Sequence, residues 1–331
     1  MKKLLLISTG GTISCSDTVQ GLSPKLTFDE LLDKVPYNSN EILIDGIQLM
    51  SIDSGNIIPE HWLDITSQIK QKYDQYDGFL VTHGTDTLAY TSAALSYLIQ
   101  HSRKPIVVTG SQRPIDMEGT DAVINLSQSI RVACENIGGV FVVFNNKVIH
   151  GTQARKIKTK GDDAFISLNR PDAAQFKNDK LLFNQQFLDE YKRDSQLLCF
   201  YDQLNTSVHV IKLFPGLNTK AFLYMLSIYD AVVIEAYGTG SIPFVFGDAI
   251  EGFQNQNKDE CLIVVVSQAM YEGTNMKLYE ISNKVRNYPN VVEGGLMSTE
   301  SAVTKLMWAL SNSKTIESAI EKVKTPIAYD F

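Results

Sequence analysis

Hydrophobic runs alternate with segments of helical periodicity through the first half of the chain. Strands that are covered on both faces of a parallel sheet are continuously apolar instead of alternating with polar residues. Five runs of this kind occupy residues 3–8, 42–50, 78–82, 105–109 and 139–144. We predict that each run is a buried strand of one mostly parallel sheet.

Helical segments lie between these runs. One begins at Thr27, where Glu30 follows three residues later in the spacing of a capping box. A second begins at Pro59, because proline is favoured at the first helical position. Two more helices are predicted after Asp86 and over residues 120–135. This strand–helix alternation predicts an α/β fold with helices on both faces of the sheet.

Residues 183–206 are mixed and charged, and they interrupt the alternation. We therefore predict a linker there, between an N-terminal α/β domain (residues 1–182) and a smaller C-terminal α/β domain (residues 207–331). Two domains also suit a chain of 331 residues, which exceeds the length at which one core keeps growing. In the second half the pattern predicts strands near 208–213, 231–236 and 261–267, and helices near 219–228, 245–256, 275–286, 299–311 and 315–323.

Composition and charge narrow the functional classes. Hydrophobic residues make up 44% of the chain and charged residues 20%, which is typical of a globular protein. The net charge of −7 argues against a nucleic-acid partner, because such proteins present a basic face. No apolar run approaches the roughly 20 residues that cross a bilayer. The apolar start ends at Gly10-Gly11, so we interpret it as a first strand and not as a signal peptide. We expect no membrane partner.

Cysteine and histidine spacing gives no support for a metal site. The four cysteines show no CxxC pair, which favours a reducing compartment such as the cytoplasm and argues against disulfides and zinc. The five histidines form no HExxH pair, so no metal is expected. Cys15, close to the first polar loop, is either a reactive thiol or an incidental small residue.

Polar residues crowd the ends of four predicted strands. In open parallel sheets, ligands bind beyond the carboxyl ends of the strands, so four such loops predict one polar pocket. The loops are Ser8-Thr9-Gly10-Gly11-Thr12, Asp53-Ser54-Gly55-Asn56, His83-Gly84-Thr85-Asp86-Thr87 and Thr109-Gly110-Ser111-Gln112.

Each loop has a functional and a purely structural interpretation. A threonine hydroxyl such as that of Thr12 needs a base or a strong local field to attack a carbonyl; otherwise Thr12 caps a tight turn. Thr85 or Asp86 is expected to cap the following helix, which does not exclude function, since a carboxylate there can bind a substrate ammonium. We interpret His83, which precedes the turn, as structural and not as the general base.

A base is offered by the lysines that follow the fifth strand. Lys156 or Lys158, if buried in such a pocket, can accept a proton or stabilise an alkoxide; the alternative is a solvated basic loop. The chain has no GxSxG, GxGxxG or GK[ST] motif. Serine esterases, dinucleotide-binding enzymes and P-loop enzymes are therefore not supported.

Two of these loops resemble the signatures of the bacterial-type L-asparaginase family. Thr9-Gly10-Gly11-Thr12-Ile13 is similar to the first signature, T-G-G-T-I, and His83-Gly84-Thr85-Asp86-Thr87 to the second, H-G-T-D-T. The second segment and its flanks look like cytoplasmic, type I-like members. The resemblance continues at Asp53-Ser54, Thr109-Gly110-Ser111-Gln112, the lysines near 156, Tyr237-Gly238-Thr239-Gly240 and Lys305-Leu306-Met307-Trp308.

The resemblance implies a fold and a reaction. The fold is a larger flavodoxin-like N-terminal domain with a mostly parallel sheet and a smaller C-terminal α/β domain. The reaction is hydrolysis of L-asparagine to L-aspartate and ammonia, with no metal or organic cofactor, and glutamine stays open as a second substrate. Members are commonly homotetramers, assembled as dimers of dimers, in which the partner's C-terminal domain helps to close each site; here Ser241 stands near that position.

The resemblance also assigns roles to residues. Thr12 would be the nucleophile, and Thr85, Asp86 and Lys156 would form a second hydroxyl–carboxylate–ammonium set. Ser54 and Asp86 would hold the α-carboxylate and α-ammonium of the substrate. The remaining substrate-binding residues would be Gly11, Asp53, Thr85 and, through its backbone, Ser111.

The chain departs from the family at one position. Members usually carry a tyrosine on the lid after the first signature, whereas this chain has Leu22 in Gly21-Leu22-Ser23-Pro24. Leucine cannot transfer a proton. Lys156 acting through Thr85, or a bound water, would then activate Thr12.

Two other functions compete with the hydrolase. A related amidotransferase subunit supplies ammonia for misacylated tRNA and shares both signatures, but it normally has an additional N-terminal domain. The start of this chain at its first strand and its acidic charge favour the hydrolase. A non-catalytic amino-acid sensor would keep Ser54 and Asp86, whereas the presence of Thr12, Thr85 and Lys156 favours an enzyme.

Overall fold

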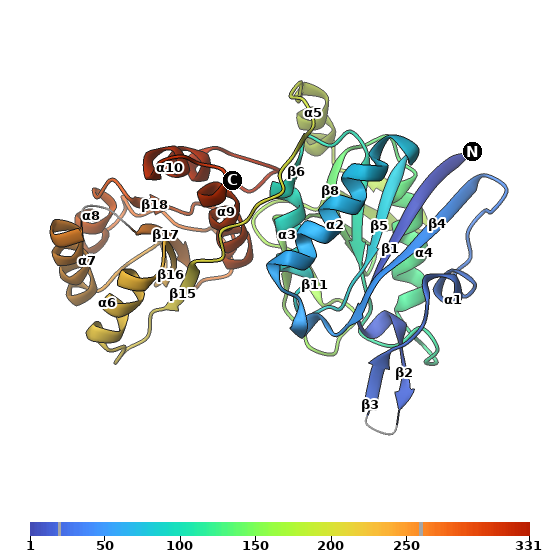
Figure 1. Ribbon diagram of the computed structural model, residues 1–331, viewed down its shortest axis with the longest axis horizontal. Helices are drawn as coiled ribbons and strands as arrows, with labels where there is room; N and C mark the ends of the chain where they lie inside the picture. Colours follow the sequence, from blue (N-terminus) through green and yellow to red (C-terminus); the bar gives the residue numbers. More distant parts are fainter. Residues whose placement is uncertain (19–20, 258–260) are drawn as a thin grey trace. The chain divides into compact units, whose positions relative to one another are not determined.

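The five apolar runs of the first half form the parallel centre of one eight-stranded sheet (Figure 1). Every neighbouring pair among the five is parallel. Numbered by their place in the chain, they lie in the order 2-1-3-4-5, which is the flavodoxin-like order. Across the sheet they are β4 (Ile42–Ile52), β1 (Lys2–Gly10), β5 (Gly78–Thr82), β7 (Pro105–Thr109) and β8 (Gly139–Phe144).

This computed structural model describes residues 1–18, 21–257 and 261–331, which divide into two compact units, Met1–Asp202 and Gln203–Phe331. In the first unit, three antiparallel strands extend the sheet beyond β8. The sheet is therefore mostly parallel, and the predicted fold class is confirmed. The added strands are β9 (Lys147–His150), β12 (Ala174–Lys177) and β13 (Lys180–Phe183).

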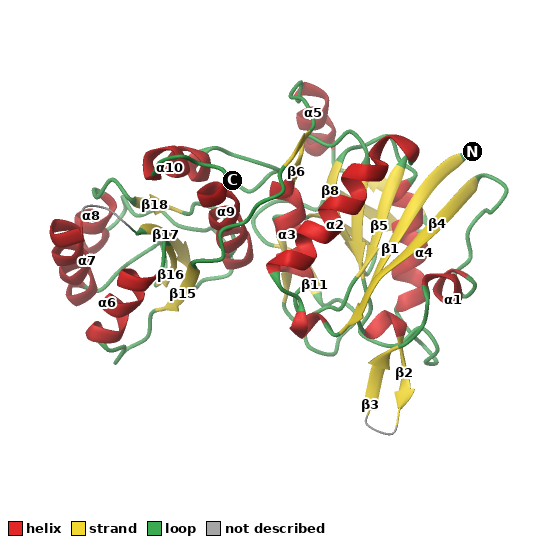
Figure 2. Ribbon diagram, in the orientation of Figure 1, coloured by secondary structure: helices red, strands yellow, loops and turns green. Residues whose placement is uncertain are grey.

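Helices cover both faces of this sheet (Figure 2). The predicted capping box is confirmed, since Thr27 and Glu30 bond reciprocally at the start of α1 (Phe28–Leu32). Pro59 is the first residue of α2 (Pro59–Lys72), also as predicted. On one face, α2 packs on α3 (Leu88–Leu98), and on the other α4 (Ala122–Ala133) packs on β5, β7 and β8.

Several short elements of the first unit carry no clear sequence signal. The predicted linker, residues 183–206, contains helix α5 (Gln185–Arg193) and strand β14 (Cys199–Phe200), which pairs with β6 (Ile99–Gln100). The other short elements are the hairpin β2 (Cys15–Thr18) and β3 (Gly21–Pro24), the pair β10 (Ala154–Lys156) and β11 (Phe165–Ser167), and the 3-10 turns η1 (Thr12–Ser14), η2 (Ser54–Asn56) and η3 (Tyr73–Gln75).

The second unit has its own four-stranded parallel sheet and its own core. Three of its strands were expected from the sequence, whereas β18 (Val291–Glu293) was not.

The predicted helix over residues 275–286 begins only at Glu280, because Met276 donates its N–H to the Glu293 carboxylate instead of entering a helix. The elements are β15 (Val208–Lys212), α6 (Thr219–Ile228), β16 (Ala231–Ala236), α7 (Phe244–Asn257), β17 (Leu262–Ser267), α8 (Glu280–Arg286), β18 (Val291–Glu293), α9 (Thr299–Ser311) and α10 (Ile316–Lys324).

A buried ion pair ties the C-terminus to α9. Lys305 Nζ lies 2.7 Å from Asp330 Oδ2, and both side chains are fully buried. Lys305 also donates to the Thr325 carbonyl oxygen at 2.7 Å. Burial lowers the pKa of Lys305, and the Asp330 carboxylate opposes that effect.

A buried chain of hydrogen bonds holds the loop that follows β5. The Trp62 indole N–H donates to Thr91 Oγ1 (2.9 Å), the Thr91 hydroxyl donates to His83 Nε2 (2.9 Å), and His83 Nδ1 donates to the Gly84 carbonyl oxygen (2.7 Å). Indole only donates and a carbonyl only accepts, so the direction of each bond and the tautomer of His83 are fixed. Burial lowers the pKa of His83 to about 4, so the imidazole is neutral at pH 7.

Replacing Lys305 with methionine is expected to destabilise the protein strongly. The change leaves the buried Asp330 carboxylate without its counter-charge, and breaking a buried pair in this way costs about 3–5 kcal/mol of unfolding free energy. Urea denaturation measures the loss. The matched control is Lys284→Met, which removes an exposed ion pair with Asp248 and Glu251 and should leave the unfolding free energy close to that of the unmodified protein. Equal losses in both variants would contradict this account of the C-terminus.

The buried neutral His83 predicts a specific pH dependence of stability. Unfolded histidine has a pKa of 6.5, against about 4 in the folded protein, so the unfolded state binds more protons between these values. The His83 contribution is therefore fully present above pH 6.5 and is lost as the pH falls toward 4. Urea denaturation at pH 7, 6 and 5 should show a shallower fall in unfolding free energy for His83→Gln than for the unmodified protein. Identical slopes would mean that His83 is not held neutral by the fold.

Candidate active site

The loops after β1 and β5 meet where the order of the strands reverses, which is the usual ligand-binding position in this fold. A Cβ atom on Gly11 would lie 2.2 Å from the backbone N and 2.4 Å from the Cα of Gly84. Gly11 also has a positive φ of 81°, which favours glycine. Two glycines thus let the two backbones touch, and Thr12 and Thr85 each directly follow one of these glycines.

The loop after β4 contacts the loop after β5 through Ser54. Its side chain is buried, its hydroxyl accepts from the backbone N–H of Asp86 (3.2 Å), and its carbonyl oxygen accepts from the Thr87 hydroxyl (2.7 Å). Asp53, the residue before it, accepts from the Gly55 N–H at 2.8 Å and thereby caps η2. The structure therefore connects Ser54 directly to the loop after β5, whereas one oxygen of Asp53 is used within its own turn.

Lys156, at the end of β10, supplies the cationic group of the site. Its Nζ atom donates to Thr85 Oγ1 at 2.7 Å and to Asp86 Oδ1 at 2.6 Å. The lysine side chain is 17% exposed and that of Asp86 is 67% exposed. Lys158 pairs instead with Asp163, so only Lys156 of the two candidate lysines reaches the site.

The expected capping role of Thr85 and Asp86 is wrong. The residue that precedes α3 is Thr87, and among the described residues its side chain makes no capping hydrogen bond. The Thr87 hydroxyl donates to Ser54, while Thr85 and Asp86 turn toward Lys156. The side chains of Thr85, Asp86 and Thr87 therefore bond to other loops and not to the first turn of α3.

The loop after β7 closes the cluster from the other side. A Cβ atom on Gly110 would lie 2.2 Å from the His83 carbonyl oxygen, so this loop packs on the loop after β5. Ser111 is fully buried, and its hydroxyl donates to the Arg113 carbonyl oxygen. Sequence reasoning missed its neighbour Gln112, whose side-chain oxygen accepts from the Thr85 hydroxyl at 3.2 Å. The only available signal was its place in the fourth polar loop.

Two other candidate groups do not take part in proton transfer at this site. Both ring nitrogens of His83 are bonded to buried partners, which agrees with the structural interpretation. Cys15 is buried with its Sγ atom 3.4 Å from the Gly11 carbonyl oxygen, and burial, aided by the Asp53 charge, raises the pKa of its thiol to about 11. The thiol is therefore protonated and behaves as a small buried residue.

Thr12 lies in η1 and is partly exposed, directly after Gly11. The chain then continues into the β2–β3 hairpin, where Leu22 pairs with Asp17. The position where a tyrosine was expected therefore lies on a strand of the segment that follows the first signature. The Gly11–Gly84 contact therefore joins the turn that carries the partly exposed Thr12 to the loop that carries the Thr85–Lys156–Asp86 set.

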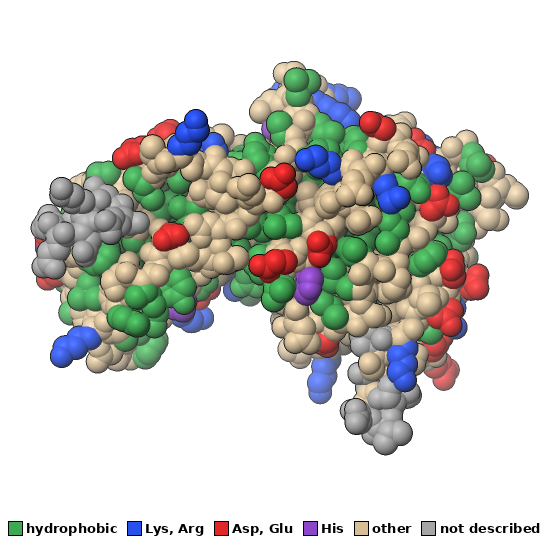
Figure 3. Space-filling view, viewed as in Figure 1, with side chains coloured by type: hydrophobic (Ala, Val, Ile, Leu, Met, Phe, Trp, Pro, Cys, Tyr) green, Lys and Arg blue, Asp and Glu red, His purple; other side chains and the backbone are tan. Residues whose placement is uncertain are grey.

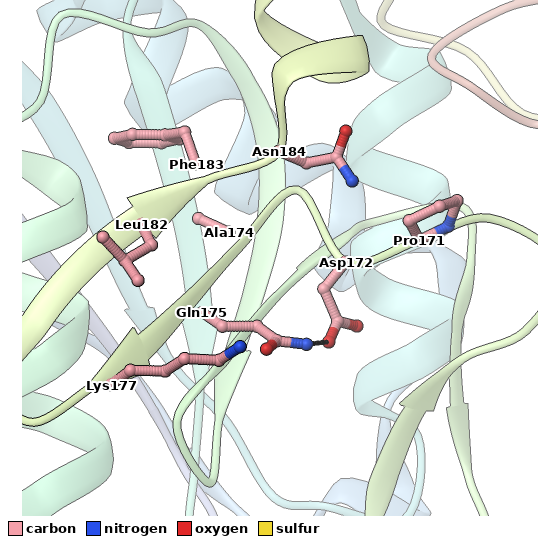
Figure 4. Close-up of a pocket in the computed structure, with 8 residues that line it drawn as sticks. All are labelled: Pro171, Asp172, Ala174, Gln175, Lys177, Leu182, Phe183 and Asn184. Atoms are coloured by element: carbon pink, nitrogen blue, oxygen red, sulfur yellow. Dashed lines mark hydrogen bonds between the residues drawn. The ribbon is translucent and has the colours of Figure 1, made fainter.

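A separate pocket at the edge of the sheet is lined by residues of the paired strands β12 and β13 and of the segments beside them (Figure 4). It has a volume of about 260 Å³ and is lined by residues that include Asp172, Gln175 and Asn184. Gln175 donates to Asp172 at 2.8 Å. None of the residues predicted to carry chemistry lines this pocket, so we do not place the active site there.

The structure also bears on metal and membrane binding. In the residues that the structure describes, no group of three or more histidine, cysteine, aspartate or glutamate side chains is placed to hold a metal ion. All four cysteines lie within the described ranges and are free. None of the described helices is long and apolar enough to cross a bilayer.

Comparison with known proteins agrees with the resemblance in the motifs. The model for the asparaginase N-terminal domain matches residues 3–188, and that for the glutaminase/asparaginase C-terminal domain matches residues 207–322. The chain is 34% identical to an L-asparaginase of Thermococcus kodakarensis over 95% of its own length and 94% of that protein. It is 32% identical to a glutamyl-tRNA(Gln) amidotransferase subunit of Methanosphaera stadtmanae, covering 98% of this chain and 75% of that protein.

Solved structures give the same result. The thermostable L-asparaginase of T. kodakarensis matches with a TM-score of 0.91 at 32% identity, covering 99% of this chain and 98% of that one. L-asparaginase I of Vibrio cholerae matches with a TM-score of 0.85 at 25% identity and the same coverage. The predicted family is therefore confirmed. With both family domains matched and nearly the whole chain aligned, this protein belongs to the asparaginase family of amidohydrolases.

Proposed function

We propose that this protein hydrolyses the side-chain amide of L-asparagine, giving L-aspartate and ammonia. The observation that carries the proposal is the contact of Lys156 with Thr85 and Asp86, beside the Gly11–Gly84 contact that brings in Thr12. The similarity to L-asparaginases over nearly the whole chain supports the same reaction.

The proposed reaction has two steps. The Thr12 oxygen attacks the amide carbon, the C–N bond breaks, and the nitrogen leaves as ammonia after taking a proton. Water then attacks the resulting ester, releasing aspartate and returning a proton to Thr12. Hydrogen-bond donors that face the carbonyl oxygen are typically worth about 3–4 kcal/mol each in such reactions. Thr85 accepts from Lys156 and follows Gly84, which contacts Gly11 beside Thr12, so we propose that Thr85 carries protons to and from Thr12.

Ser54 and Asp86 are the proposed contacts for the two charged groups of the substrate backbone. Asp86 keeps a largely exposed carboxylate although it is paired with Lys156, so an incoming ammonium can reach it. Gly11, Asp53 and the backbone of Ser111 complete the proposed set. The proposed reaction requires no metal or organic cofactor. We propose a cytoplasmic location, which the four free cysteines favour.

A second candidate is the ammonia-generating component of an amidotransferase, which the similarity to glutamyl-tRNA(Gln) amidotransferase subunits favours. Glutamine is also one methylene longer than asparagine, a difference that typically changes discrimination by about 1–3 kcal/mol. Ammonia release from free asparagine and free glutamine, without tRNA, distinguishes these functions. Ammonia release from asparagine in this assay supports the hydrolase. Ammonia release from glutamine with none from asparagine supports the amidotransferase component.

Substituting Thr12 with valine or Lys156 with methionine is expected to abolish most turnover. Loss of the nucleophile or of a proton-transfer group typically costs about 10²- to 10⁴-fold or more in rate. Ammonia release with saturating asparagine measures the loss, and circular dichroism verifies folding. Thr159→Val and Lys158→Met serve as matched controls, since Thr159 is exposed and Lys158 pairs with Asp163 outside the site. Normal turnover in Thr12→Val would remove Thr12 as the nucleophile.

We also propose that the protein is a homo-oligomer, a tetramer formed as a dimer of dimers. Four large apolar side chains on α6 and α7 are exposed by 47–62%, and the helices pack together through Phe222 and Phe246. Figure 3 shows hydrophobic side chains gathered on the face over α6. An exposed apolar cluster of this kind marks a protein–protein contact. This α6–α7 patch consists of Tyr224, Ile228, Phe244 and Val245.

Light scattering is expected to give a mass near four times the 36.9 kDa of the chain. Placing charges in the α6–α7 patch with Tyr224→Asp and Phe244→Asp should shift the mass to smaller species, because association would then bury carboxylates. Leu197→Asp, at a site 84% exposed and far along the chain from the patch, is the matched control. A monomeric mass for the unmodified protein at all concentrations would exclude the proposed assembly.

A further inference from the structure

The backbone N–H of Thr85, a residue that is only 6% exposed, has no hydrogen-bond acceptor among the residues that the structure describes. Nearby N–H groups of the same loop do have partners. That of His83 donates to the Thr109 carbonyl oxygen (2.8 Å), and that of Asp86 donates to Ser54 Oγ (3.2 Å). Buried N–H groups are nearly always hydrogen-bonded, so an unpaired one beside the proposed reactive groups is available to a bound molecule.

The direction of the Thr85 N–H is set by the carbonyl group of Gly84. The two groups belong to one planar trans peptide unit, so they point in opposite directions. The Gly84 carbonyl oxygen accepts from Nδ1 of the fully buried His83 at 2.7 Å. The Thr85 N–H therefore points away from the buried imidazole. Because glycine tolerates many backbone angles, the bond from His83 supplies a restraint that the Gly84 backbone itself lacks.

The bond to Gly84 requires the proton of the neutral imidazole to lie on Nδ1, and Thr91 selects this tautomer. The Trp62 indole N–H occupies one lone pair of the Thr91 hydroxyl oxygen (2.9 Å). In the described part of the chain, the Thr91 hydroxyl proton has no acceptor other than Nε2 of His83 (2.9 Å). Burial lowers the pKa of His83 to about 4, so the ring is neutral at pH 7 and carries one proton only. With Nε2 accepting from Thr91, that proton lies on Nδ1.

We propose that Trp62, Thr91 and His83 are positioning residues that hold the Thr85 N–H in place to donate to the amide oxygen of the substrate. The inference rests on the proposed amide hydrolysis. Negative charge develops on the amide oxygen when Thr12 attacks, so a donor fixed before the attack stabilises the transition state more than the bound substrate. The three side chains act through the Gly84–Thr85 peptide and exchange no proton during the reaction.

The first test measures the tautomer of His83. Thr91→Val, which keeps the shape of the side chain but has no hydroxyl, is compared with Thr91→Ser, which keeps the hydroxyl. ¹⁵N NMR of histidine-labelled protein distinguishes the two ring nitrogens, and the His83 signals are assigned by their absence in His83→Gln. The unmodified protein and Thr91→Ser should carry the proton on Nδ1, whereas Thr91→Val should carry part of it on Nε2. Trp62→Phe, which removes the indole N–H, should change the tautomer in the same direction as Thr91→Val.

The second test measures ammonia release from asparagine by the same samples. Thr91→Val is expected to lower kcat by about 10- to 100-fold, because the donor is misdirected and not removed, with KM changed less than about threefold. A purely structural role for the hydroxyl would give no link between the tautomer and kcat. Thr91→Ser restores the donor to Nε2 and should therefore keep a kcat close to that of the unmodified protein.

The matched control is Thr304→Val. Thr304 is buried in α9, where its hydroxyl donates to the carbonyl oxygens of Glu300 (2.8 Å) and Ser301 (3.2 Å), so this variant also loses a buried hydroxyl. It should leave kcat and the His83 tautomer unchanged. A proton that stays on Nδ1 in Thr91→Val, or a changed tautomer with normal kcat, would overturn the proposal. Absence of ammonia release by the unmodified protein would instead refute the proposed function, whatever the tautomer.

Discussion

The close approach of Gly11 and Gly84 is the constraint on which the site depends. The two backbones touch at the position where the strand order of the sheet reverses, and a single methyl group on Gly11 would lie 2.2 Å from the backbone of Gly84. No side chain fits between them. The loops that follow β1 and β5 are therefore held at backbone contact, and Thr12 and Thr85 are placed by the sheet itself. Because the contact is between backbone atoms, changes in side-chain packing have little effect on the positions of these two loops.

Two sets of hydrogen bonds hold the groups around this contact. In the first set, the buried chain from Trp62 through Thr91 and His83 to the Gly84 carbonyl oxygen has only one consistent assignment of donors and acceptors. In the second set, the Thr85 hydroxyl accepts from Lys156 and donates to Gln112. The first group holds the backbone in place, and the second connects the Thr85 hydroxyl, the Lys156 ammonium and the exposed Asp86 carboxylate.

Much of this architecture could be predicted from the sequence, because the signals were local. Continuous apolar runs gave the parallel strands, and Thr27 with Glu30 gave a helix start that the structure has. What the sequence could not give depends on distant contacts. Strand β18 and the β10–β11 pair are too short for a periodic signal, and the cap expected from Thr85 or Asp86 lost to contacts with Ser54 and Lys156. Gln112 was missed for the same reason, since its side-chain hydrogen bonds are to Thr85 and to the loop of residues 158–161, which are distant in the sequence.

The most direct test of the central claim is to identify the residue that carries the acyl group during turnover. The protein is mixed rapidly with asparagine, quenched in acid, digested and analysed by mass spectrometry. If Thr12 attacks the amide, we expect one aspartyl group esterified to Thr12. The modified peptide is then the one that contains the first signature. Active enzyme that yields the adduct on Thr85, or on any other residue, would contradict the account.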